Sequence, residues 1–142
     1  MINSIQHFFW LAQQTLGGCL YFWQLGLILL LSSILALIFN KQFKSKLINK
    51  KIFLVLTSFI FTLLILLVGT VFQKDNSLLN VSANIAEIVL MSIAAVQIIY
   101  SLYLIWLLKG FMLFTLLFSL LIIYISLWAC FVASMSVSGD WL

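Results

Sequence analysis

The chain has 142 residues, of which 65% are hydrophobic and 7% are charged, with a formal net charge of +4 and a mean hydropathy of +1.29. Soluble domains are about 45–50% apolar and about 25% charged, so this composition excludes a separate water-soluble catalytic or nucleic-acid-binding domain. We therefore expect one membrane domain over residues 1–142, with the lipid bilayer as its surroundings and no nucleic acid among its partners.

The N-terminal segment, residues 1–16, has an apolar stripe with helical spacing. The stripe consists of Ile5, Phe8, Ala12 and Leu16. Because a helix of this kind can lie flat in the membrane surface, the pattern predicts a short interfacial helix on the outer side, followed by a bend at Gly17 and Gly18. A single long, tilted first span that begins near Phe8 is the alternative.

Four apolar segments follow, each long enough to cross a hydrocarbon core of about 30 Å. They cover residues 18–39, 52–72, 83–108 and 111–137. A strand without a neighbour would leave backbone amides and carbonyls unpaired in lipid, so each segment is expected to be a helix. The sequence thus predicts an all-α integral membrane protein with an up-down bundle of four transmembrane helices. Lys109 and Gly110 predict a tight hairpin between the last two, with Gly110 as a left-handed cap.

Five of the seven lysines lie in the connection formed by residues 40–51. They are Lys41, Lys44, Lys46, Lys50 and Lys51. Positively charged residues are retained on the side of the membrane where synthesis takes place, so these lysines determine the orientation. The pattern predicts that loop 40–51 and Lys109 face the cytoplasmic side and that both termini lie outside. The membrane would be a bacterial inner membrane or an organellar membrane.

Small residues recur at helical or heptad spacing in all four predicted spans. They are Gly26, Ser33, Ser58, Thr62, Gly69, Ala94, Ser101, Ser119, Ser126 and Ala133. Lipid gives no hydrophobic reward for helix association, so transmembrane helices associate where small residues let their backbones approach closely. We expect these positions to form the helix interfaces; a pore or substrate path is the alternative.

Glu87 is the only acidic residue within a predicted span, which makes it a candidate functional residue. It lies about one turn inside the predicted outer boundary, with Asn84 one turn before it. Its carboxylate has three possible roles: a structural one, the handling of protons or cations, or a bond to a partner subunit. Gln97 lies deeper, and its amide is expected to bind a neighbouring helix rather than a ligand.

The chain contains few residues that could form a disulfide or bind a metal. The up-down topology brings Cys19 and Cys130 to a similar depth near the outer face, so they could form a disulfide or remain free thiols. His7 is the single histidine, and the three acidic residues are far apart in sequence. No ligand spacing for a metal or haem is present, and we expect no metal and no cofactor.

Aromatic residues gather near the predicted outer boundary, with Trp23 and Trp128 among them. Belts of Trp and Tyr at membrane boundaries are the ordinary explanation. Alternatively, these residues could join Asn84 and Glu87 in a docking surface for a lipid, a quinone or an extracytoplasmic partner.

The sequence offers no nucleophile, base or metal set, so we expect no enzymatic activity. The favoured interpretation is a structural or accessory subunit whose apolar faces pack against other membrane protein subunits. The alternative is a homo-oligomeric channel or transporter, in which several copies place Glu87 and Gln97 around a shared axis.

Overall fold

The computed structural model describes residues 2–39, 48–73 and 83–139, and every element in these ranges is helical. The elements are α1 (Ile2–Tyr21), α2 (Trp23–Ile38), α3 (Ile48–Leu56), α4 (Phe59–Val71), α5 (Ala83–Leu107), the 3₁₀ turn η2 (Lys109–Phe111) and α6 (Met112–Ser138). Helices are what a chain of this apolarity must form in lipid, because only they satisfy the backbone within one segment. The predicted all-α fold is confirmed.

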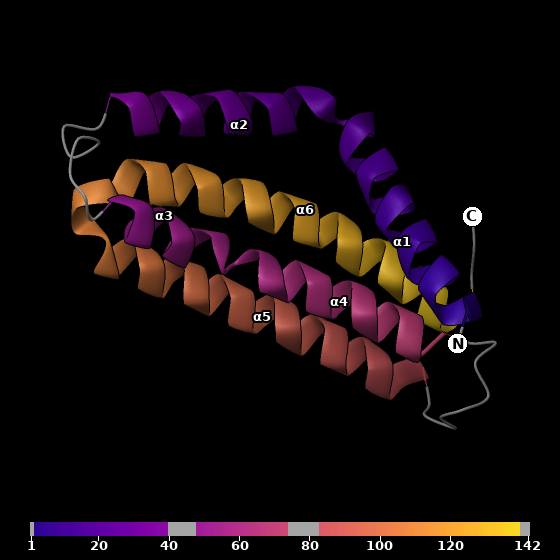
Figure 1. The fold of residues 1–142 in the computed structure, drawn as a ribbon. Helices are drawn as coiled ribbons and strands as arrows, with labels where there is room; N and C mark the ends of the chain where they lie inside the picture. The colour runs from indigo at the N-terminus through magenta and orange to yellow at the C-terminus, as the bar shows by residue number, and fades with distance from the viewer. Residues whose placement is uncertain (1, 40–47, 74–82, 140–142) are drawn as a thin grey trace.

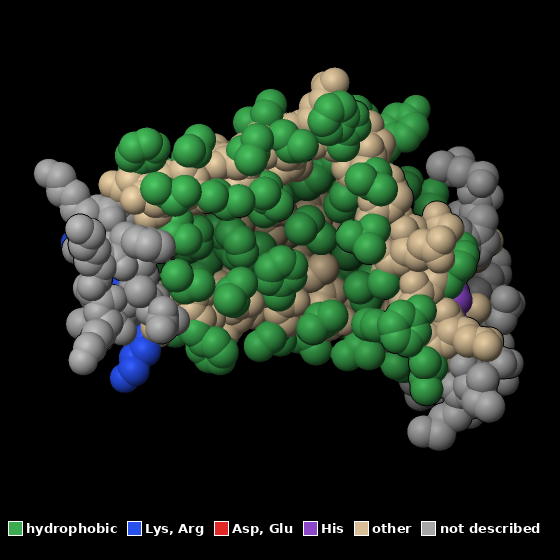
Figure 2. Space-filling view, turned by 45° about the horizontal axis from the view of Figure 1, so that its top comes forward, with side chains coloured by type: hydrophobic (Ala, Val, Ile, Leu, Met, Phe, Trp, Pro, Cys, Tyr) green, Lys and Arg blue, Asp and Glu red, His purple; other side chains and the backbone are tan. Residues whose placement is uncertain are grey.

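Three helical segments are long and apolar enough to cross a membrane. They are Lys50–Val71, Asn84–Leu107 and Lys109–Ser138. They agree closely with the predicted spans 52–72, 83–108 and 111–137. The structure is therefore consistent with a membrane location, and Figure 2 shows apolar side chains spread over the body of the molecule with lysine at one end.

The first predicted span, residues 18–39, differs from the structure. Helix α1 continues without interruption through Gly17 and Gly18 to Tyr21, and α1 and α2 then meet at an angle of 88°. The bend lies at Phe22, whose backbone leaves the helical region with φ −110° and ψ 43°. Helix α2 has only 16 residues, so a fourth crossing exists only if the bent pair forms one broken span.

The interfacial helix predicted to end at Leu16 is longer than expected and packs against the bundle. Helix α1 contacts α4 and α6, and it buries Leu11 and Thr15 completely or nearly so. The glycine at position 18 serves this packing rather than a bend, because a Cβ atom there would overlap the ring of Trp128.

The other helices are arranged around α6. Helices α4 and α5 lie beside it, α2 runs along its other side, and α1 slants across one end (Figure 1). We call that end, where α4 and α6 finish and α5 begins, the terminal end. The opposite end, which holds η2, is the Lys109 end.

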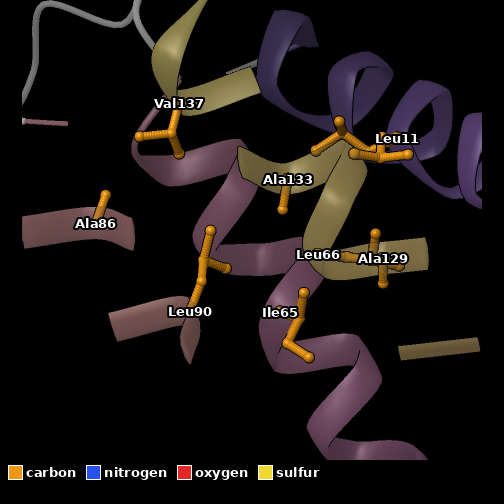
Figure 3. Close-up of a cluster of buried hydrophobic side chains, with 9 residues drawn as sticks. Leu11, Ile65, Leu66, Ala86, Leu90, Ala129, Ala133 and Val137 are labelled. Carbon is orange, nitrogen blue, oxygen red and sulfur yellow. The ribbon is translucent and has the colours of Figure 1, made fainter. Parts of the chain in front are cut away.

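Small residues form the seam between α4 and α6, as predicted. A Cβ atom built on Gly69 would lie 2.7 Å from the Cβ of Ala133, so only glycine permits this approach. Further along, the hydroxyls of Thr62 and Ser126 are 2.6 Å apart and share a hydrogen bond. An apolar cluster surrounds the glycine contact (Figure 3). It contains Leu11, Ile65, Leu66, Ala86, Leu90, Ala129, Val132, Ala133 and Val137.

The Lys109 end has its own apolar cluster and a tight turn. Phe111 is buried there with Val55 and Leu108, and the Lys51 ammonium lies 5.0 Å from the centre of the Phe111 ring. The predicted hairpin between α5 and α6 is confirmed, but the left-handed cap at Gly110 is wrong. The turn is the 3₁₀ segment η2, and among the described residues the positive φ belongs to Gly139, which ends α6.

Candidate functional site

An open groove of about 810 Å³ runs between α5 and α6 near the terminal end. Its polar lining comes from Asn84, Glu87 and Ser92 of α5 and from Ser134 of α6, with the thiol of Cys130 beside them. Further along the groove, α5 contributes the small side chains of Ala94 and Ala95. Large apolar side chains, among them Ile88, Met91 and Phe131, line the rest of the groove, so its surface is mainly apolar. A carboxylate beside such a surface is unusual where the surface faces lipid.

Glu87 is half-buried and sits at the edge of this groove. It is the fifth residue of α5, just past the first turn of the helix. Its recorded hydrogen bond comes from the Ser134 hydroxyl, which donates to Oε1 over 3.5 Å. A bond of that length is weak, and the carboxylate retains capacity for a further donor.

Gln97 is placed elsewhere, in the interior between α4, α5 and α6. It is 1% exposed, whereas Glu87 and Asn84 border the groove. Ten residues of α-helix separate Glu87 from Gln97 by about 15 Å along the axis and about 80° around it. One copy of the chain therefore does not present the two side chains to a common surface.

The two candidate tryptophans occupy different surroundings. Trp128 covers Gly18, stacks on Phe22 with ring centroids 6.2 Å apart, and lines two smaller grooves on the α1 and α2 side of α6. Trp23 begins α2 and is 54% exposed, outside all three grooves. The Phe131 side chain borders all three grooves.

Both cysteines are free thiols in the structure. Cys130 lines the groove on the α5 side of α6, whereas the carbonyl of Cys19 accepts a hydrogen bond from the Tyr124 hydroxyl at 3.1 Å. Tyr124 lines a groove on the α2 side of α6. Cys130 thus faces the α5 side of α6, whereas Cys19 of α1 lies against another side of that helix.

The predicted topology lysines are only partly described. Lys41, Lys44 and Lys46 lie outside the described residues. Lys50 is exposed, and Lys51 and Lys109 lie at the same end of the bundle, where the Lys109 ammonium is 5.8 Å from the Trp106 ring. This grouping is the one that the orientation prediction requires, although the structure contains no membrane.

A contact that the sequence did not reveal joins α1 to the bundle. His7 Nε2 lies 2.8 Å from the hydroxyl of Ser136, and that hydroxyl donates to the carbonyl of Gly69 at 3.0 Å. Because the Ser136 proton points to the carbonyl, His7 is the donor in the first bond. Ser136 is 1% exposed, so this is a structural link between α1, α4 and α6 rather than an activated nucleophile.

Metal binding finds no support in the residues that the structure covers, since no group of three His, Cys, Asp or Glu side chains comes together there. No protein-family model, curated protein or solved structure matches the chain.

Proposed function

We propose that the protein is a non-catalytic accessory subunit of a larger membrane complex, and that the α5–α6 groove receives a transmembrane helix of its partner. The observation that carries the proposal is the half-buried Glu87, which has one weak hydrogen bond and borders a mainly apolar groove. A carboxylate in the apolar part of a membrane is costly unless another group pairs with it.

The composition of the groove favours a helix over lipid tails as its occupant. Ala94, Ala95 and Ser92 allow a second backbone to approach α5 closely, and Glu87 and Asn84 can accept and donate hydrogen bonds from one end. Lipid chains need neither feature. The expected partner helix has small residues along one side and a lysine, arginine, amide or hydroxyl opposite Glu87.

Orientation completes the proposal. Lys50, Lys51 and Lys109 share one end of the bundle, and the rule that positive residues stay inside assigns that end to the cytoplasmic side. Glu87 and both termini would then face the other side, and α1 would cover the bundle near that boundary. The partner contact would accordingly lie in the outer half of the membrane.

We do not extend the proposal to a channel. A path built from Glu87 and Gln97 would need both on one surface, whereas Gln97 is enclosed by helices of its own chain. Several copies around an axis would bring their Glu87 side chains together without the amides.

Site-specific crosslinking in native membranes tests the proposal. A photoreactive amino acid at Met91, which lines the groove and is 70% exposed, should give one discrete product containing a different membrane protein. The matched control is Val96, another residue of α5, which is 51% exposed and does not line the groove. The product should disappear when Glu87→Leu is added. A product of twice the chain mass of 16.2 kDa, or equal products from both positions, would contradict the proposal.

A further inference from the structure

The long helix that contains α3 and α4 is interrupted in its interior. Between Leu56 and Phe59 the amides of Ser58 and Ile60 bond to the carbonyls three residues earlier, at 3.1 and 3.0 Å. The carbonyl of Leu54 instead accepts the hydroxyls of Thr57 at 2.6 Å and of Tyr100 at 3.5 Å. Interrupted membrane helices occur where the backbone borders a polar interior.

Three buried serines surround this break. The hydroxyls of Thr57 and Tyr100 are 2.6 Å apart, and the rings of Phe59 and Phe118 are 6.2 Å apart, so these pairs mark one level of the bundle. Next to them in sequence are Ser58, Ser101 and Ser119, which are 0%, 3% and 2% exposed. None of the three hydroxyls has a hydrogen-bond partner among the described residues.

Gln97 adds two unpaired side-chain atoms to the three serine hydroxyls, and we call these four side chains the layer. It lies one turn from Ser101 on the same face of α5, and neither its amide nitrogen nor its amide oxygen has a partner within the described ranges. On the other side, Thr62 and Ser126 bond to each other and close the layer toward the apolar cluster. Five polar side-chain atoms are thus enclosed by α4, α5 and α6.

We infer that this layer is a binding site for a cluster of buried water molecules that bridge Gln97 to the three serines. An unpaired polar group in an apolar interior is costly, and buried polar groups nearly always find protein or water partners. Water fits because it both donates and accepts, as hydroxyls and an amide require.

The absence of charged side chains around the layer, among the residues that the structure describes, argues against an ion as its occupant. The charged side chains of the described residues lie elsewhere, Glu87 in the outer groove and Lys50, Lys51 and Lys109 at the end of the bundle. A bare ion in a neutral, apolar interior costs far more than hydroxyls and one amide return. The water site does not depend on the proposed accessory role, because it lies within one copy of the chain.

Magic-angle-spinning NMR of the full chain in lipid bilayers tests the site, with glutamine and alanine labelled by ¹³C and ¹⁵N. Magnetisation is transferred from water protons, and Gln97→Leu identifies the Gln97 side-chain signal. The transfer to Gln97 should be fast, comparable to that of the exposed Gln14. Ala129, which is fully buried in the apolar cluster, is the slow reference.

Ser119→Val places methyl groups in the layer and should abolish the fast transfer to Gln97. Ser32→Val is the matched control, because Ser32 lies on α2, away from the layer, and bonds to the Ile28 carbonyl of its own helix at 2.6 Å. Transfer to Gln97 as slow as to Ala129 in the wild-type chain would overturn the inference, and so would fast transfer that survives Ser119→Val. If Ser119→Val does not fold, the wild-type comparison decides alone.

Discussion

The two sides of α6 use the same residue types in opposite ways. Toward α4, small residues meet small residues, with Gly69 against Ala133 and Thr62 bonded to Ser126. Toward α5, near the terminal end, Ser134, Ala94 and Ala95 border an open groove that also has large apolar residues in its lining and that none of the described helices fills. Small residues thus form a closed seam only where a second helix packs on them. An open groove with a carboxylate beside it favours a partner helix.

Substitution of Gly69 should have the largest effect on stability. Gly69→Leu forces side-chain atoms into the space held by Ala133, and overpacking of this kind costs about 1–3 kcal/mol. The loss would be measured as a lower thermal or SDS-unfolding midpoint in detergent. Gly17→Leu is the control, because a Cβ atom at Gly17 meets nothing within 4 Å, and equal losses from both variants would contradict the close seam.

Removing the hydrogen bond in the same seam should have a smaller effect. Thr62→Val keeps the shape of the side chain but leaves the Ser126 hydroxyl without its partner at 2.6 Å. Interhelical hydrogen bonds in membranes contribute about 0.6–2 kcal/mol, and a loss in this range is expected. A double-mutant cycle with Ser126→Ala measures the coupling, and strictly additive losses would show that the two hydroxyls do not interact.

The link between α1 and the bundle should be weaker still and local. His7→Phe removes the donor to Ser136 while keeping an aromatic ring beside Trp10. Hydrogen exchange in α1 should become faster by a factor that corresponds to about 1 kcal/mol, with little change in α4 and α6. Unchanged exchange in α1 would mean that burial of Leu11 and Thr15 holds the helix alone.

Filling the open groove should leave the stability of the isolated chain nearly unchanged. Ala95→Leu adds apolar atoms to a surface that none of the described helices covers, so the free energy of unfolding should change by less than about 0.5 kcal/mol. The same variant should lose the crosslinked partner. A large loss of stability would instead show that the groove is part of the folded core.

The sequence predicted the parts of this fold that depend on pattern. Spans near residues 52–72, 83–108 and 111–137 follow from apolar length, and the Gly69 seam follows from the spacing of small residues. It did not predict the bend at Phe22 or the helix at Gly18, because the Trp128 ring that packs on this glycine is distant in sequence. The break at Thr57 and Ser58 was missed for the same reason, since the Tyr100 hydroxyl that meets it comes from another helix.

The candidate site was only partly predictable. Glu87 and Asn84 were identified because polar groups in an apolar span are conspicuous, and the structure places both beside the α5–α6 groove. Gln97 was identified on the same ground, but its position inside the bundle depends on which face of α5 packs against α4 and α6. Sequence alone does not fix that face when the helix is apolar all round.

The most direct test of the accessory role is cryo-electron microscopy of the protein purified from its native membrane in mild detergent. The account predicts a helix of another polypeptide in the α5–α6 groove, with a hydrogen-bond donor or a positive side chain within bonding distance of the Glu87 carboxylate. A groove filled by ordered lipid alone, with the partner or a second copy bound on another face, would contradict it.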